Sequence, residues 1–215
     1  MTQSYSRREP SPVEEMANSI SHGLGLVASV AAAPVLIITA MKAGGPQAIP
    51  GAAIYSVTVV GLYLASTLYH ALPEARGKGF FRILDHAAIF LLIAGTYTPF
   101  TLGVLRGPWG WTLLGLIWTL AIVGLILKAV PATRYSRVSI VLYVVMGWLA
   151  VIAARPILLQ VPLPGVLWIV AGGLAYTSGL IFFGMHRLRF HHFIWHLFVL
   201  AGTICHFFAV LWYSV

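Results

Sequence analysis

Charged residues are scarce in this chain. Only 8% of its 215 residues are charged, whereas 60% are hydrophobic. In an ordinary soluble domain about a quarter of the residues are charged, so the composition excludes that class. Cys205 is the only cysteine, which excludes an internal disulfide. The sequence therefore predicts an integral membrane protein that forms one bundle.

Two further features are missing. The first residues, MTQSYSRREPSPVEEM, hold arginines but no short apolar core followed by a small-residue cleavage site. We therefore expect no removable signal peptide, and the first span would itself serve as the insertion signal. Runs of alternating polarity, which would indicate a membrane barrel, are also absent. Residues 1–16 are expected to form a short cytoplasmic tail and residues 17–215 a single transmembrane domain.

What the chain does have is a series of apolar runs, each long enough to cross about 30 Å of hydrocarbon as a helix. We predict an all-α bundle of seven transmembrane helices, bounded in most cases by glycine or proline. The predicted spans are residues 20–41, 48–70, 84–105, 109–129, 138–158, 164–184 and 192–214.

Lysines and arginines alternate between the two ends of these spans. One end receives ten of them: Arg7, Arg8, Arg76, Lys78, Arg82, Lys128, Arg134, Arg137, Arg187 and Arg189. The other end receives only Lys42, Arg106 and Arg155. This bias predicts a cytoplasmic N-terminus and a C-terminus outside the cell. Because the positive charge lies in short loops between apolar spans, it indicates membrane orientation and no nucleic-acid partner.

Five polar residues are expected at one depth near the cytoplasmic face. Asp85, the only acidic residue within the apolar runs, starts the third span. Ser66 and His70 end the second span, and His192 and His196 start the seventh. A carboxylate inside a membrane segment marks a functional-site hypothesis by default. The three helices therefore bring one carboxylate, one hydroxyl and three imidazoles to the same level.

The histidines suggest a metal site. His192 and His196 lie one helical turn apart, a spacing at which both can ligate one ion. With His70 they would supply three protein ligands to Zn²⁺, which keeps a fourth position for water. Each residue also has a simpler interpretation: Asp85 can cap its helix, and Ser66 can bond back to a carbonyl of its own helix. Their joint occurrence at one depth favours the metal.

The same residues carry a family resemblance. Four segments, SISHGLG (19–25), STLYH (66–70), LDHAAIFLLIAGTYTPF (84–100) and HHFIWHLFVLAGTICHFF (191–208), resemble the bacterial haemolysin III proteins. These belong to the progestin and adiponectin receptor (PAQR) family, within a wider superfamily that includes the alkaline ceramidases. The resemblance covers nearly all of the chain, and an N-terminal E-x-x-N-x-x-S/T-H pattern also matches, at Glu15, Asn18, Ser21 and His22.

The resemblance implies a zinc site on the cytoplasmic side of a seven-helix bundle in the bacterial inner membrane. It implies that His70, His192 and His196 are the zinc ligands. Asp85 and Ser66 would be the catalytic residues, which hold a water molecule beside the metal. The sequence alone leaves open whether Asp85 is instead a fourth ligand.

Three functions are compatible with these residues. The favoured one is a zinc-dependent hydrolase of a lipid amide or ester, in which Asp85 accepts a proton and Ser66 donates to the developing oxyanion. Its substrate, a membrane lipid, would insert its acyl chain between helices where Gly95, Gly172, Gly173 and Gly179 leave room. One alternative is a receptor-like or regulatory protein with structural zinc. The other is a membrane-perturbing (haemolytic) pore, for which His206 is the deep titratable candidate.

Overall fold

Long apolar helices make up most of the protein. The computed structural model describes residues 10–43, 45–73 and 77–214. Its helices are α1 (Pro12–Ala43), α2 (Ala48–Ala71), α3 (Lys78–Leu102), α4 (Pro108–Ala129), α5 (Val138–Gly147), the 3-10 helix η1 (Leu149–Ala153), α6 (Ala154–Gln160), α7 (Leu163–Gly184) and α8 (His191–Tyr213). Within these residues seven helical stretches can cross a membrane by length and composition, with Val138–Gln160 counted as one. The predicted all-α bundle of seven spans is confirmed.

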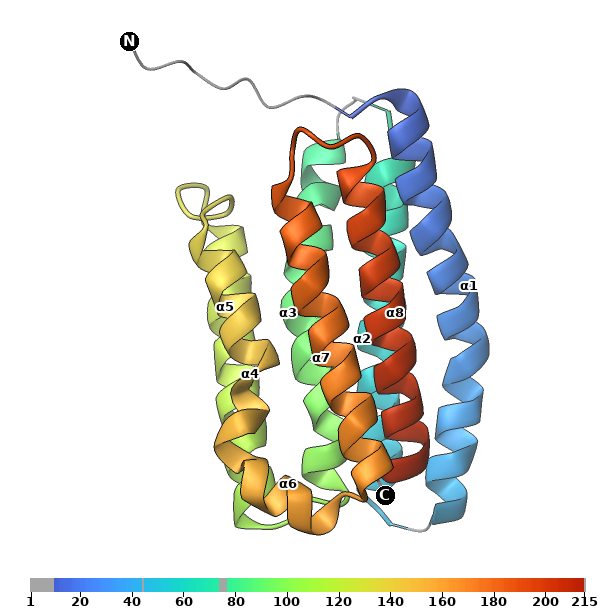
Figure 1. The fold of residues 1–215 in the computed structure, drawn as a ribbon, viewed down its shortest axis with the longest axis vertical. Coiled ribbons are helices and arrows are strands. Elements are labelled where there is room, and N and C mark those ends of the chain that lie inside the picture. The colour runs from blue at the N-terminus through green and yellow to red at the C-terminus, as the bar shows by residue number, and fades with distance from the viewer. Residues whose placement is uncertain (1–9, 44, 74–76, 215) are drawn as a thin grey trace.

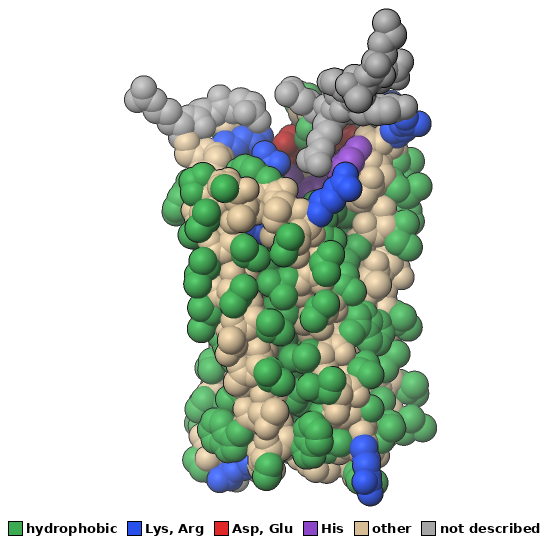
Figure 2. Space-filling model, turned by 90° about the vertical axis from the view of Figure 1, so that its left-hand side faces the viewer, with side chains coloured by type: hydrophobic (Ala, Val, Ile, Leu, Met, Phe, Trp, Pro, Cys, Tyr) green, Lys and Arg blue, Asp and Glu red, His purple; other side chains and the backbone are tan. Residues whose placement is uncertain are grey.

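The bundle has two chemically different ends. In Figure 1 the upper end holds the starts of α1, α3, α5 and α8, and the lower end holds the starts of α2, α4 and α7. We call the upper end, formed by residues 72–73, 77, 130–137 and 185–190, the histidine end. An apolar band separates the Lys and Arg side chains of the two ends (Figure 2). Arg7, Arg8 and Arg76 lie outside the described residues, and the cytoplasmic position of the histidine end stays a prediction.

Helix α1 begins at Pro12, eight residues before the predicted start at residue 20. Ser11 and Glu14 form a reciprocal cap: the Ser11 N–H donates to Glu14 Oε2 at 2.8 Å, and the Glu14 N–H donates to Ser11 Oγ at 3.3 Å. Such a capping box satisfies main-chain donors that a helix start otherwise leaves open. Residues 12–16, which the prediction assigned to the tail, are therefore helical in the structure. Residues 1–9 lie outside the described part.

The fifth predicted span is interrupted. Between α5 and α6 the chain tightens into η1, because Pro156 has no N–H and its ring conflicts with the carbonyl four residues earlier. The Tyr97 hydroxyl of α3 donates to the Met146 carbonyl and accepts from the Ala150 N–H, both at 2.9 Å. A side chain from a neighbouring helix thus replaces missing main-chain bonds where water is absent. In Figure 1 α6 then turns across the lower end of the bundle to the foot of α7.

Helix α3 is central, since it packs against α2, α4, α5 and α8. Glycines allow close helix approach elsewhere in the same bundle. A Cβ at Gly95 would lie 2.0 Å from Thr58 Oγ1, and one at Gly172 would lie 2.5 Å from the ring of His206. A Cβ at Gly179 would lie 2.7 Å from a ring carbon of Trp195. Neighbouring side chains therefore fill the room that these glycines were predicted to leave for an acyl chain.

Candidate metal centre

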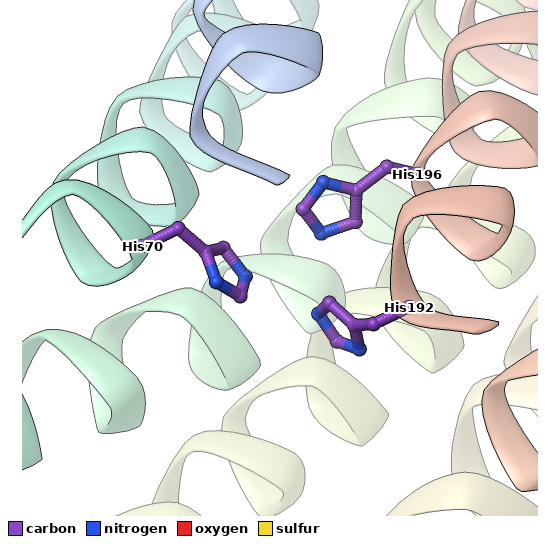
Figure 3. A group of neighbouring side chains, drawn as sticks. All are labelled: His70, His192 and His196. Carbon is purple, nitrogen blue, oxygen red and sulfur yellow. The ribbon is translucent and has the colours of Figure 1, made fainter. Parts of the chain in front are cut away.

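Three histidines from two helices meet at the histidine end of the bundle. His70 comes from the last turn of α2, and His192 and His196 come from the first turns of α8. One possible ligand atom from each lies within 4.8 Å of the others. Figure 3 shows the three imidazoles turned toward one common space. The structure therefore brings together the three residues that the sequence predicted as ligands.

The first ligand is oriented by a carboxylate from α1. Nδ1 of His70 lies 2.5 Å from Oε2 of Glu15, and the other oxygen of Glu15 accepts from Lys78 Nζ at 3.3 Å. Because an ionised carboxylate can only accept, Nδ1 of His70 carries a hydrogen. The lone pair of His70 is then on Nε2, which is buried and has no hydrogen-bond partner. Carboxylates orient metal-binding histidines in this way in many proteins.

The third ligand is oriented by the same helix. Nδ1 of His196 lies 3.1 Å from the carbonyl oxygen of Asn18 and 3.1 Å from the hydroxyl of Ser21. A carbonyl oxygen can only accept, so Nδ1 of His196 also carries a hydrogen and Nε2 offers its lone pair. The ring of His22 stacks on His196, with 3.5 Å between centroids and an angle of 6° between planes. Helix α1 therefore sets both the tautomer and the tilt of His196.

These residues fit a zinc ion. Nε2 of His192, like that of His70, is buried without a hydrogen-bond partner, an arrangement that costs free energy unless a ligand is bound. Neutral imidazole is a preferred zinc ligand, and bonds of about 2.0–2.1 Å place the nitrogens of a tetrahedral site about 3.4 Å apart. The candidate ligand atoms lie within 4.8 Å of one another, so the side chains would have to close slightly around an ion to reach that separation.

The start of α8 is also fixed by α1. Phe190, the residue before α8, has a positive φ of 58°, which is uncommon for a residue other than glycine. Its N–H donates to Glu14 Oε1 at 2.8 Å. Glu14 thus joins the start of its own helix to the start of the helix that carries two of the histidines. The contact offsets the cost of the left-handed backbone and holds His192 in register with His70.

Asp85 and Ser66 lie beside the histidines. Asp85 is buried in α3, close enough to Ser66, His70 and Arg82 to interact with each. Its carboxylate is not part of the group of atoms within 4.8 Å that the three histidines form. The hydroxyl of Ser66, which is fully buried, lies 2.7 Å from Nδ1 of His22. Asp85 therefore borders the cluster, while Ser66 has a partner that the sequence did not predict.

The remaining histidines serve other contacts. His86 of α3 lies beside Tyr135, and the rings of His186 and His191 meet edge to face with centroids 5.3 Å apart. His206, in the second half of α8, lies with Nε2 3.1 Å from the carbonyl oxygen of Ile169 and packs against Gly172.

Helix α1 has a buried polar face that the apolar pattern of the sequence did not predict. Residues 14, 18, 21, 22 and 25 of α1 are buried, whereas its apolar side chains Met16, Ile20, Leu24 and Val27 are exposed. The helix is thus polar inside and apolar outside near the histidines, as suits a helix that faces lipid. The capping-box spacing of Ser11 and Glu14 could have located its start, and the E-x-x-N-x-x-S/T-H pattern marks the same face.

These features define a class: a multi-pass membrane protein of seven apolar helices, with a buried cluster of histidines at one end. Comparison with known proteins identifies the family. The family profile described as "Haemolysin-III related" matches residues 11–207. The chain belongs to the haemolysin III family.

Individual relatives agree with this placement. The chain is 46% identical over 213 residues to "Hemolysin-3" of Bacillus cereus, an alignment that covers 99% of this chain and 97% of that protein. It is 43% identical over 202 residues to "Hemolysin-3 homolog" of Bacillus subtilis (strain 168), covering 94% and 95% of the two chains. Human "Monocyte to macrophage differentiation factor" is 27% identical over 166 residues, covering 73% and 67%. The last similarity agrees with the predicted membership in the wider PAQR family.

Proposed function

We propose that this chain is a zinc-dependent hydrolase that cleaves an amide or ester bond of a lipid in the bacterial inner membrane. The observation that supports the proposal is the group of three imidazoles, of which His70 and His196 are buried and His192 is half-buried, beside a buried carboxylate. Two of the three have buried Nε2 atoms without a hydrogen-bond partner. His70, His192 and His196 would hold the metal. Zinc in such a site supplies Lewis-acid chemistry, polarising a carbonyl oxygen and lowering the pKa of water to about 7.

Asp85 would be the general base and then the general acid. It lies next to the histidines but outside their group of ligand atoms, which suits a role in proton transfer. Asp85 would accept a proton from the attacking water as the carbon–oxygen bond forms. It would return that proton to the leaving nitrogen or oxygen as the lipid bond breaks, which leaves a fatty acid and an amine or alcohol.

Ser66 would stabilise the oxyanion of the tetrahedral intermediate. Its hydroxyl can do so only if its own hydrogen is free. This requires Nδ1 of His22 to donate the hydrogen bond between them, and the hydroxyl hydrogen to turn away from Asp85, with which Ser66 also interacts. Nε2 of His22 is buried without a hydrogen-bond partner. In this tautomer Nε2 carries no hydrogen, so it is not an unsatisfied buried donor. A single oxyanion donor typically contributes roughly 3–4 kcal/mol to transition-state stabilisation.

The depth of the site supports a lipid substrate. The histidines occupy the last turn of α2 and the first turns of α8, at the edge of the apolar band. The ester and amide bonds of lipids lie at the same boundary, between hydrocarbon and head groups. The decisive experiment is metal analysis of the purified protein, followed by mass spectrometry of fatty acids released from amide-linked and ester-linked lipids. Zinc-loaded protein that releases no fatty acid from either class would contradict the proposal.

A second candidate is a receptor-like protein in which zinc is structural. The observation in its favour is that Glu15, Asn18 and Ser21 hold the ligands from a third helix, so that a metal there would fasten α1, α2 and α8 together. The two candidates differ in what Asp85 does, and the amide variant Asp85→Asn separates them.

The name "Hemolysin-3" of the two bacterial relatives raises a third possibility, lysis of membranes. If the chain forms a pore, dye should leak from liposomes in proportion to the protein that they contain. We expect no such leakage, since the ionisable side chains in the described part of the chain gather mainly at the two ends of the bundle.

The predicted topology needs a separate test in intact cells. A reporter protein fused to the C-terminus should be detected outside the cytoplasm.

A further inference from the structure

A second polar cluster lies at the histidine end, where α3, α4 and α5 meet. The Lys128 ammonium, in the last turn of α4, donates to the carbonyl oxygen of Arg134 at 2.8 Å. The Arg82 guanidinium of α3 stacks on the ring of Tyr135, with 4.4 Å from Cζ to the centroid. Arg134 and Tyr135 are consecutive, so two cations from two helices contact neighbouring residues of the loop 130–137. We call Arg82, Lys128, Ser136 and Ser139 the cationic cluster.

Lys128 is buried, and none of the described residues forms an ion pair with it. Only 5% of its surface is exposed, and its ammonium has three hydrogens but one carbonyl acceptor. The ion pairs formed among the described residues involve Glu15 and do not include Lys128. Asp85 is near Arg82, which in turn is near enough to Lys128 to repel it. A buried charge is costly unless it is paired, and the described part of the chain supplies no counter-charge to this ammonium.

Hydroxyl groups in the same place also lack partners. Ser139, in the first turn of α5, is 1% exposed, and its hydroxyl makes no hydrogen bond among the described residues. The hydroxyl of Ser136 in the preceding loop is in the same situation. Each costs free energy when it is buried without a partner.

The helix contacts place these hydroxyls level with the cations. One turn deeper, the Tyr143 hydroxyl of α5 donates to the carbonyl oxygen of His86 in α3 at 2.7 Å. Ser139 is one turn before Tyr143, and Arg82 is one turn before His86. Residues four apart lie on the same face of a helix, so Ser139 faces α3 at the level of Arg82.

We propose that the cationic cluster binds the phosphate group of a lipid head group. The cluster offers an ammonium, a guanidinium and two hydroxyls and no carboxylate of its own, which matches a ligand with negative charge and several acceptor oxygens. It lies at the edge of the apolar band, at the end of the bundle where Figure 2 shows a group of Lys and Arg side chains. Basic pockets between helices at the cytoplasmic face are suited to anionic lipid head groups. The proposal does not depend on zinc or on hydrolysis.

A simpler interpretation of Lys128 is that it neutralises the negative end of the α4 dipole and extends its charge into water. The interaction with the carbonyl of Arg134 agrees with the first half of this interpretation. The burial of Lys128 contradicts the second half, because a side chain that is 5% exposed does not reach water. This interpretation of Lys128 also does not explain the unpartnered hydroxyl of Ser139.

The test measures binding to the purified, delipidated full-length protein in a non-ionic detergent. The probes are dihexanoyl phosphatidylglycerol, dihexanoyl phosphatidylcholine with the same acyl chains, and inorganic phosphate, each followed by the rise in melting temperature. We expect phosphatidylglycerol to bind at least about tenfold more tightly than the other two. Lys128→Met and Ser139→Ala should each weaken that binding, the first by about tenfold or more. Arg137→Gln, an exposed charge removed from the same loop, should leave it unchanged.

A second readout protects the test against a variant that merely unfolds. Without any lipid, Lys128→Met should raise the melting temperature by about 2–4 °C, because it removes an uncompensated buried charge but keeps the length of the side chain. Wild-type binding by both Lys128→Met and Ser139→Ala would overturn the site. Equal affinity for inorganic phosphate and phosphatidylglycerol would overturn the lipid as its ligand. A lowered melting temperature of lipid-free Lys128→Met would overturn the claim that the charge is uncompensated.

Discussion

The two polar clusters at the histidine end are opposite in kind. Around His70 and His196, carboxylate, carbonyl and hydroxyl oxygens from α1 contact the imidazoles. Nε2 of His70 and Nε2 of His192 are buried there without a hydrogen-bond partner. Around Lys128, donors and positive charge accumulate, with one carbonyl oxygen as the acceptor. What each cluster lacks indicates its ligand: a cation for the imidazoles and an anion for the ammonium. Because both clusters are buried, each costs free energy when its ligand is absent. Measurements of cation binding and of anion binding therefore test the two predictions.

Asp85 stands between the clusters. It interacts with His70 on one side and with Arg82 on the other. Arg82 is four residues from His86 and three from Asp85, so a single turn of α3 carries the border between the two sites. Because the two clusters are separate, we expect different effects from changes to the imidazoles, to Asp85, to the oxygens of α1 and to Lys128.

The largest effect is expected from the imidazoles themselves. The His192→Ala, His196→Ala double variant should fall from about one zinc per chain to less than about 0.1, because one imidazole cannot hold the ion in competition with water. Metal content is measured by mass spectrometry after purification without chelator. His186→Ala, a histidine in the loop before α8 but outside the cluster, is the control and should keep its zinc. Full zinc in the double variant would show that the metal, if any, is held elsewhere.

Asp85→Asn should abolish turnover and keep the metal. An amide cannot accept a proton at neutral pH, and loss of a general base typically lowers the rate by about 10²–10⁴. The three imidazoles stay in place, so zinc content and melting temperature should match the unaltered protein. If Asp85 is instead a fourth ligand, zinc and thermal stability should decrease together, since bound metal contributes to folding. That outcome would favour the receptor-like candidate.

The oxygens of α1 should have an intermediate effect. Glu15→Gln should weaken zinc binding by about 10–100-fold, because Glu15 fixes the tautomer and orientation of His70. The affinity can be read from competition with a chromogenic chelator. Ser19→Ala is a suitable control, since Ser19 also bonds to α2, at the carbonyl of Thr67, but touches no histidine of the cluster. Equal affinities of both variants would mean that α1 only packs against the site.

The candidate site could be predicted largely from the order of the helices. Alternating spans place the end of the second, the start of the third and the start of the seventh at one level, which is why Ser66, His70, Asp85, His192 and His196 could be grouped. The partners from α1 could not be grouped in the same way, because contact between His22 and Ser66, 44 residues apart, depends on how each helix is rotated. Apolarity on all sides of a membrane helix gives no signal for that rotation.

Other features were hidden for different reasons. The break after α5 depends on one proline, Pro156, inside an apolar run, and on Tyr97 of another helix, which supplies the missing bonds. Lys128 was counted only as one of many loop charges that set orientation. Its burial follows from the packing of α3, α4 and α5 around loop 130–137, and a sequence does not show how loops fold back.

The smallest effect should be that of Lys128→Met on the metal. Lys128 contacts Arg134 and no histidine of the metal cluster, so zinc content should stay at that of the unaltered protein. Removing a positive charge from the neighbourhood of a cation site should tighten zinc binding slightly, by no more than about threefold, because screened charges interact weakly. A chelator titration of Lys128→Met beside the Arg137→Gln control measures this difference.

The same small coupling should appear in reverse. If phosphatidylglycerol neutralises Lys128, adding it should also tighten zinc binding, and zinc should tighten the binding of the lipid by the same factor, since coupling between two binding sites is reciprocal. In Lys128→Met both factors should fall to about one. If Lys128→Met weakened zinc binding by more than about tenfold, the two clusters would not be separate sites. The imidazoles and the cationic cluster would then be parts of one site, rather than two neighbouring sites that meet at Asp85.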